Sequence, residues 1–379
     1  MKFGLPNKTL MLAAGLLLWL VLEGRARPAH AVPLFAREYE VTCAKCHTVI
    51  PHLNEFGAAF MANGNRIPGV QPGPVVPFSS KINLIDSSQN QGSGPNGAGL
   101  PKAIVDEVEL FSAGAIGRRA SYFVEQYAID GGTPGLTRDA WLSERLNPWD
   151  ARIPLYAQVG SFTLSLPVDP ETFRDSNQHY TLYDQKVGAN SFNLFDPKIG
   201  ARIGVGDSLR GLSAQVFAGP GHDRRSGLAS RGTDVMFYGQ DAIGPLAISV
   251  YRYQGVRPTP LGLPDRFQRS GYGLVYNQWG RFSSETVLQT GWDSNCGPAD
   301  TSGCASSGGF TQMRFQFNAR LYALARYEGT GDPANGFARD GVLLLGYGPT
   351  RNSRLTIEDV IQHVPQATHT MNAQLTMAF

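Results

Sequence analysis

The sequence predicts an all-β chain: a transmembrane antiparallel β-barrel of about sixteen strands that follows a small N-terminal α-helical segment. Three observations lead to this prediction. An export-type leader opens the 379-residue chain, short segments of period-two alternation fill residues 80–379, and a single Cys-x-x-Cys-His motif lies between them. The charge balance, 33 Lys and Arg against 31 Asp and Glu, argues against a nucleic-acid-binding protein that neutralises phosphates.

Residues 1–31 have the features of a signal peptide. Lys2 and Lys8 give a positive n-region, residues 9–22 form a short apolar core, and Ala29-His30-Ala31 is a small-x-small cleavage site. The alternative is a retained membrane anchor, but this apolar stretch is shorter than the ~20 residues that a spanning helix needs. We therefore expect an exported chain whose mature form begins at Val32.

The motif Cys43-Ala44-Lys45-Cys46-His47 is the attachment sequence of c-type haem. On a helix, positions i, i+3 and i+4 share one side, so both thiols can form thioethers to a haem while His47 reaches the iron. A zinc ribbon would need a second Cys or His pair nearby, and a thioredoxin-like dithiol would need a βαβ context. Neither is present, so we predict one covalent haem c with His47 as the proximal iron ligand.

The distal iron ligand stays open at this point. Met61 lies on a predicted helix from Asn54, a plausible N-cap, to Asn63, with Gly64 as the stop. This helix can fold back over the haem, so Met61 is the preferred candidate. His52 is the alternative, but it is so near His47 that it would need a tight chain reversal. A five-coordinate iron also remains possible.

The haem-bearing segment, residues 32–69, is short for independent folding, since chains below ~40 residues need an additional constraint. We expect the haem to supply one constraint and packing in or against the lumen of the larger body to supply another. Pro68, Pro72, Pro74 and Pro77 indicate an extended linker over residues 70–79.

The barrel is predicted from alternation along residues 80–379. The last strand is the clearest: Met371, Leu375 and Phe379 share one face, while Asn372 and Gln374 lie on the other. Other segments repeat the pattern, with apolar positions at Leu246, Ile248, Val250, Tyr272, Leu274, Tyr276, Met313, Phe315 and Phe317.

Such strands suit a soluble sandwich or a transmembrane barrel, and three features favour the barrel. Spacing of about nineteen residues per strand and turn fits ~10-residue spanning strands. Arg314 and Arg320 lie between apolar neighbours, as polar residues facing a wet lumen do. Aromatic residues near strand ends suggest an interfacial girdle: Trp279, Trp292, Tyr322, Tyr327 and Tyr347.

Cys296 and Cys304 lie in the polar, glycine-rich stretch DSNCGPADTSGC between two predicted strands. In an oxidising compartment we expect them to form one local disulfide. This bridge would stiffen an extracellular loop, and no redox role is assigned to it.

The N-terminal region, LFAREYEVTCAKCHTVIPHLNEFGAAFMANG over 34–64, resembles the fused monohaem cytochrome–porins, which include those of iron-oxidising bacteria. The matching residues are Phe35-Ala36-Arg37, Cys43, Cys46, His47, Pro51, Leu53, Asn54, Phe56-Gly57, Phe60 and Asn63-Gly64. A departure is Asn65, where the family often has Tyr, so the haem surroundings differ in detail. The barrel matches only in general character.

The resemblance implies a protein of the bacterial outer membrane that passes electrons between an extracellular couple, with Fe(II) as the best guess, and a periplasmic c-type cytochrome or other carrier. It would then be an electron-transfer protein of the iron:cytochrome c oxidoreductase type, with outer-membrane lipid around it. Two alternatives are kept. One is a passive outer-membrane porin whose haem-bearing segment is a plug or sensor, and the other is a soluble periplasmic cytochrome on a β-sandwich.

Overall fold

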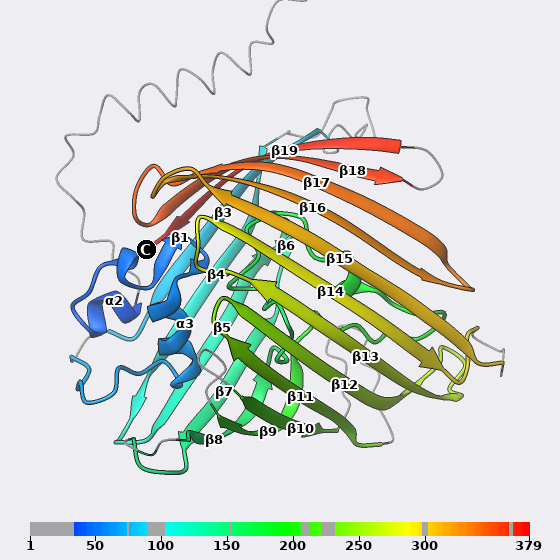
Figure 1. Cartoon of the computed structure of the whole chain (residues 1–379), viewed down its shortest axis with the longest axis horizontal. Coiled ribbons are helices and arrows are strands. Elements are labelled where there is room, and N and C mark those ends of the chain that lie inside the picture. The colour runs from blue at the N-terminus through cyan, green and yellow to red at the C-terminus, as the bar shows by residue number, and fades with distance from the viewer. Residues whose placement is uncertain are drawn as a thin grey trace, which may run out of the picture. The chain divides into compact units, whose positions relative to one another are not determined.

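The predicted fold class is confirmed by a computed structural model. The strands form a closed antiparallel barrel in which sixteen strands make up the described wall, and the few helices are short (Figure 1). The structure describes residues 34–73, 76–88, 103–149, 151, 153–206, 212–220, 232–297, 302–363 and 367–379. The predicted signal peptide, residues 1–31, lies outside these ranges.

Each wall strand pairs with its neighbour in sequence, which gives the up-and-down order of the barrel. The wall strands are β3 (Ser79–Ser87), β4 (Ala103–Ile116), β5 (Ala120–Asp130), β7 (Thr137–Arg145), β8 (Leu155–Phe162), β9 (Lys198–Gly206), β10 (Ser213–Gly219), β11 (Asp234–Ile243), β12 (Leu246–Pro258), β13 (Pro264–Tyr276), β14 (Phe282–Asp293), β15 (Cys304–Gln316), β16 (Leu321–Asp332), β17 (Gly336–Tyr347), β18 (Ser353–His363) and β19 (Ala367–Ala378). The two-residue β6 (Thr133–Pro134) extends the edge of β5. The first wall strand begins at Ser79, one residue before the predicted start of the barrel.

The ring closes between the first and last strands. β19 pairs antiparallel with β3, with Leu375 opposite Leu84. At the end of this pairing, the backbone groups of Ser80 and Phe379 exchange two hydrogen bonds of 3.1 and 2.8 Å. The C-terminal residue is therefore part of the closure, and no strand of the ring is left as an open edge.

The alternation predicted for the strands is present with the apolar side chains outside. On β19, Met371 is 49% exposed and Gln374 is 4% exposed. On β15, Met313 and Phe315 are exposed while Gln312 and Arg314 are buried. An apolar outer face with a polar inner face is the reverse of a soluble protein and is typical of a barrel surrounded by lipid.

Two details of the predicted surface are wrong. Tyr322, expected in an aromatic girdle, is 0% exposed and faces the interior, and Trp279 packs against the interior cluster. Arg320, expected in the lumen, lies exposed in the turn between β15 and β16. For Tyr322 the cause is register, because a shift of one residue moves a side chain to the other face of a strand. Trp279 and Arg320 lie in turns, where the alternation of a strand does not apply.

The two mouths of the barrel differ. At the mouth where β3 begins and β19 ends, called the short-turn mouth, the connections include the tight turns 117–119, 244–245 and 317–320. At the opposite, long-loop mouth, the connections include residues 294–303 and 163–197. The second of these folds back into the barrel, and we call residues 163–197 the inner loop.

The inner loop is held by charged side chains on the inner faces of β16 and β18. The Glu358 carboxylate accepts hydrogen bonds from the backbone N–H groups of Asn177 and Gln178 at 2.8 and 3.1 Å. Arg326 donates to the Gln178 carbonyl at 2.9 Å, among other contacts. A short helix, α4 (Thr181–Asp184), packs there as well, with Thr181 N–H donating to Glu328 at 2.8 Å.

Apolar side chains of the inner loop and of the facing wall form a packed cluster inside the barrel. Tyr180 stacks on Phe310 of β15 with ring centroids 4.5 Å apart, and Phe192 lies 4.5 Å from Tyr253 of β12. The cluster also contains Leu164, Leu166, Phe173, Tyr183, Leu194, Phe195, Phe217, Met236, Phe267 and Val287. This part of the lumen is therefore filled with protein instead of water.

The segment before the barrel, residues 34–73, is called the N-terminal segment. It contains α2 (Leu34–Glu38), a 3-10 turn η1 (Cys43–Lys45), a hairpin of β1 (His47–Val49) and β2 (His52–Leu53), and α3 (Glu55–Ala62). Among the described residues, none of the helices has the length and apolar character needed to cross a membrane.

Candidate functional site

The two cysteines of the motif lie on a single tight turn. Cys43–Lys45 form the 3-10 turn, and Cys46 N–H donates to the Cys43 carbonyl at 3.1 Å. The motif predicts a helix through His47, but His47 instead begins β1. A 3-10 turn still brings residues i and i+3 to one side, so the two thiols keep the relation that the helix predicted.

Helix α3 packs closely against this turn. Asn54 caps the helix as predicted, because its side chain accepts from Gly57 N–H at 3.0 Å. The backbone N–H of Asn54 donates to the Cys46 carbonyl at 2.8 Å. A Cβ at Gly57 would lie 2.2 Å from that carbonyl oxygen, so only glycine permits the close approach. The motif is thereby fixed against the helix that carries Met61.

His47 is oriented by a backbone carbonyl. Its Nδ1 lies 3.0 Å from the oxygen of Pro51, and since a carbonyl can only accept, Nδ1 carries the proton. Burial lowers the pKa of His47 from 6.5 to about 4, although the contact with Pro51 acts in the opposite direction. At neutral pH the ring is therefore uncharged with a free Nε2 lone pair, which is the form that binds iron.

The Cys43 and Cys46 thiols are half-buried and not disulfide-bonded. Burial raises the pKa of both thiols. Within the described ranges, no group of three or more His, Cys, Asp or Glu side chains is arranged to hold a metal ion. Two cysteines at this spacing are what the two thioethers of a c-type haem would require.

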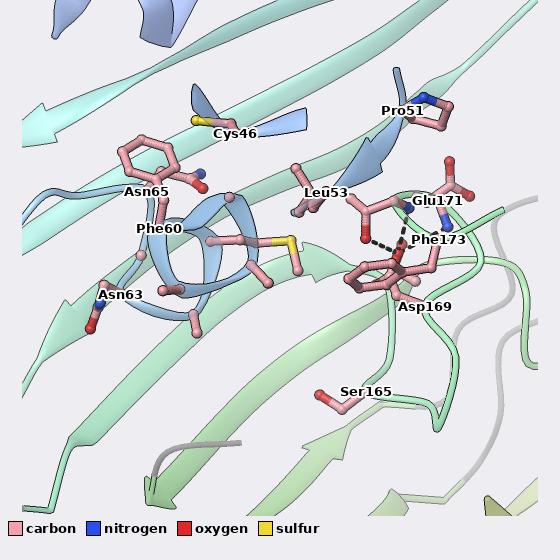
Figure 2. Close-up of a pocket in the computed structure, with 18 of the residues that line it drawn as sticks. Cys46, Pro51, Leu53, Phe60, Asn63, Asn65, Ser165, Asp169, Glu171 and Phe173 are labelled. Atoms are coloured by element: carbon pink, nitrogen blue, oxygen red, sulfur yellow. Dashed lines mark hydrogen bonds between the residues drawn. The ribbon is translucent and has the colours of Figure 1, made fainter. Parts of the chain in front are cut away.

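A cavity of about 810 Å³ opens beside the motif at the short-turn mouth. Cys43, Cys46 and His47 all line it. Its apolar lining comes from the N-terminal segment, the wall and the inner loop: Phe35, Ile50, Leu53, Phe60, Phe111, Phe123, Trp141, Phe162, Leu164, Phe173 and Trp279. Figure 2 shows Cys46, Leu53 and Phe60 on one side of this cavity and Ser165, Asp169 and Phe173 of the inner loop on the other.

The residues present fit a covalent haem. The volume is in the ~300–1,000 Å³ range of ligand cavities, the lining includes a group of aromatic side chains, and two thiols and one neutral imidazole line the same space. Cys43 and Cys46 would hold the group covalently, and His47 Nε2 would bind its iron.

The structure separates the two candidates for the distal ligand. Met61 lines the cavity, whereas His52 is absent from its lining. His52 is directed to the inner loop: its Nδ1 lies 3.1 Å from Asp175, and its ring lies 5.3 Å from that of Phe173. The hairpin of β1 and β2 does reverse the chain, but it turns His52 away from the cavity.

The N-terminal segment spans the short-turn mouth from one side of the wall to the other. Arg66 donates to the carbonyls of Gly117, Arg118 and Ala120 in the β4–β5 turn at 2.7–3.0 Å. On the far side, Val49 is buried in an apolar cluster with Tyr322, Leu324, Val342, Leu344 and Val360 on β16–β18. The segment is thus anchored through Arg66 on one side of the cavity opening and through Val49 on the other.

At the long-loop mouth, the disulfide-bonded cysteines Cys296 and Cys304 have Cα atoms 5.5 Å apart. The bridge contacts the inner loop, because Val187 is fully buried against it. Ala189 N–H donates to the Cys296 carbonyl at 2.9 Å. The disulfide-bridged loop therefore also anchors the inner loop at Val187 and Ala189.

Solved structures of porins resemble this chain. An anion-selective porin from Comamonas acidovorans matches with a TM-score of 0.57 at 12% identity, over 80% of this chain and 98% of that one. Salmonella typhi OmpF, in complex with daunomycin, matches with a TM-score of 0.57 at 12% identity, over 80% and 97%. Vibrio cholerae OmpT with loop L8 deleted gives 0.52 at 11%, over 80% and 98%. No protein-family model and no curated protein matches the sequence. At these identities the likeness establishes the porin fold alone.

Sequence reasoning missed the inner loop and Asp175. Residues 163–197 lack period-two alternation and are rich in aromatic residues, which was a usable signal for a non-strand insertion. Asp175 gave no signal, because its partners His52, Arg314 and Arg354 are distant in sequence.

Proposed function

We propose that this protein is a plugged, porin-like barrel of the bacterial outer membrane that carries one covalent haem c and passes electrons between an extracellular couple and a periplasmic carrier. Its apolar outer face would contact outer-membrane lipid. In such barrels, short turns face the periplasm and longer loops face outward. The short-turn mouth, with the candidate site, would then meet a periplasmic c-type cytochrome.

One observation carries the proposal: Cys43, Cys46 and His47 face one cavity, with His47 oriented by Pro51. When bound, haem c supplies a one-electron Fe(III)/Fe(II) couple whose potential depends on its axial ligands and burial. The two thiols would attach the group, His47 would bind its iron, and Met61 is the proposed distal ligand. Phe60 and Phe173 would limit the access of water.

The packed lumen supports a route for electrons over a route for solutes. The inner loop fills the interior with aromatic side chains, and the N-terminal segment lies across the short-turn mouth. Fe(II) remains the best candidate donor, on the resemblance of residues 34–64 to the cytochrome–porins. A carrier at the periplasmic mouth would complete the path.

A second candidate is a passive porin in which the haem-bearing segment is a plug or sensor. The likeness to solved porins favours it. The two proposals differ in what crosses the membrane, so conductance in planar bilayers separates them. Solute flux that is independent of haem redox state would favour the porin.

The decisive experiment uses the purified mature protein in detergent, with a haem stain on a denaturing gel and an absorption spectrum before and after addition of Fe(II). We expect covalent haem that Fe(II) reduces. His47→Ala should lose the normal spectrum while the barrel still assembles. His363→Ala, at the long-loop end of β18, is the matched control. Protein without covalent haem would contradict the proposal.

A further inference from the structure

The walls of the cavity differ in charge. On the β3–β7 side, the charged lining residues are mostly acidic, and the lining cation is paired: Lys81 lies 2.5 Å from Glu109. Outside the lining, Arg138 of β7 contacts Glu171 of the inner loop. On the β8–β11 side, the lining residues Gln158, Gln215, Tyr238 and Gln240 are neutral. One cation, Arg202 of β9, lies among them.

Arg202 is held in place by neutral groups. Its guanidinium donates to Ser165 Oγ at 2.7 Å and to Gln158 Oε1. Its plane lies 4.8 Å from the ring of Phe162. These contacts come from β8 and the inner loop, so the guanidinium is fixed at the junction of wall and plug.

The hydrogen-bonding capacity of Arg202 is not used up by the protein. Its Nε is buried and has no hydrogen-bond partner. The carboxylates that act on it through space, Asp139 and Asp169, form no ion pair with it within the described part of the chain. A guanidinium has five N–H donors, and one that is not paired with an anion is suited to bind a carboxylate through two parallel hydrogen bonds.

We propose that Arg202, held in position by Ser165 and Gln158, is a carboxylate-binding residue, and that its ligand is a propionate of the haem. This inference rests on the proposed function. The vinyl and propionate groups of a haem lie on opposite edges, so thioethers to Cys43 and Cys46 direct the propionates away from the N-terminal segment. The acidic β3–β7 wall repels them, and Arg202 attracts them. Figure 2 shows Ser165 on the opposite side of the view from Cys46.

A free small carboxylate from the periplasm would use the same chemistry, and the test separates the two sources. The variants are Arg202→Gln, which removes the charge, and Arg202→Lys, which keeps it. The matched control is Arg252→Gln on β12, an exposed arginine that also donates to a glutamine, Gln268 Oε1, at 2.6 Å. Midpoint potentials of the intact holoprotein are measured in detergent, with and without added acetate.

A cation next to a propionate favours the reduced iron, because the reduced centre carries one positive charge fewer. Each variant is first shown by the haem stain to carry covalent haem. We then expect Arg202→Gln to lower the midpoint potential, Arg202→Lys to lower it less, and Arg252→Gln to leave it unchanged. None of these potentials should depend on acetate. A wild-type potential that shifts with acetate, and an Arg202→Gln potential that does not, would retain the site but assign it to a free carboxylate. Equal potentials in wild type and Arg202→Gln, with and without acetate, would overturn it.

The failure of the inference and the failure of the proposed function remain distinguishable. Absence of covalent haem rejects the function, and the site is then tested by calorimetric titration of acetate into wild type and Arg202→Gln. Binding that only the wild type shows would support a carboxylate site without haem, and equal heats would reject it. If Arg202→Gln does not assemble, Arg202→Lys serves in both measurements, since it loses the planar two-pronged contact.

Discussion

His52 of the N-terminal segment and Asp175 of the inner loop form a buried pair, with Nδ1 and Oδ2 3.1 Å apart and both side chains 1% exposed. Asp175 also lies 2.7 Å from Arg314 Nε on β15, and its carbonyl accepts from Arg354 of β18 at 3.0 Å. The Asp175 carboxylate thus joins the N-terminal segment, the inner loop and the wall.

Replacing Asp175 by Asn should destabilise the folded barrel. The variant leaves His52 and Arg314 buried without a charged partner, and breaking such a pair costs ~3–5 kcal/mol. The temperature at which the protein loses its folded mobility on a detergent gel should fall clearly. Asp359→Asn is the matched control, because Asp359 also pairs with a histidine, the 60% exposed His369, at 3.2 Å. An exposed pair contributes at most ~1 kcal/mol, so equal effects in the two variants would contradict a stabilising role for the buried Asp175 contacts.

The same carboxylate predicts a loss of stability in acid. Burial raises the pKa of Asp175, but His52 and Arg314 outweigh it and lower that pKa from 3.8 to about 2. A folded-state pKa below the unfolded value stabilises the protein fully above the unfolded pKa, and this stabilisation is lost as pH falls through the folded pKa. The difference in unfolding temperature between wild type and Asp175→Asn should therefore shrink from pH 3.8 to about pH 2. A difference that stays constant over this range would rule out Asp175 as its source.

Met61 is expected to be the distal iron ligand. Met61→Ala should remove the ~695 nm band typical of Met–iron ligation and lower the midpoint potential, since a Met ligand raises it. His52→Ala should keep that band, because His52 contacts Asp175 and lies outside the cavity lining. Loss of the band in His52→Ala alone would reverse the assignment.

Removing the disulfide should loosen the inner loop inside the barrel. The bridge between Cys296 and Cys304 packs against Val187 of the inner loop. Cys296→Ser with Cys304→Ser should increase ion conductance in planar bilayers. The comparison is the wild type with its disulfide intact, measured in the same bilayers. Unchanged conductance in the Cys296→Ser and Cys304→Ser variant would show that the disulfide does not hold the inner loop in place.

An arginine on the outer face of the barrel should destabilise the protein more the closer it lies to the middle of the membrane. Leu288 is exposed at the middle of β14, and Phe282 is exposed at its short-turn end. An arginine at the bilayer midplane costs ~2–4 kcal/mol, against ~0–1 kcal/mol near the interface. Leu288→Arg should therefore lower the stability in lipid vesicles more than Phe282→Arg does. Equal losses would argue against a membrane band centred on Leu288.

The wall was predictable from the sequence because its signal is local. Each strand alternates with period two, so Met371 and Gln374 could be assigned to opposite faces without knowledge of their neighbours. Tyr322 was misplaced because composition near a strand end does not fix which face a residue occupies. The cap at Asn54 was likewise local, since it depends on a residue only three positions away.

The inner loop and the direction of His52 were not predictable in this way. Both depend on contacts between distant parts of the chain, such as His52 with Asp175 and Arg326 with Gln178. The motif identified Cys43, Cys46 and His47 as candidates from spacing alone. Their common cavity became visible only when the wall and the inner loop had been placed around them.

The pairing of β3 with β19 has a consequence for biogenesis. β19 follows the other described wall strands in the sequence, so the ring closes only when β19 has reached β3. The docking surfaces of the N-terminal segment, the β4–β5 turn and the β16–β18 wall, come together only at that step. Before closure the cavity around Cys43 and Cys46 is not yet formed, so both thiols would be open to the machinery that attaches the proposed haem.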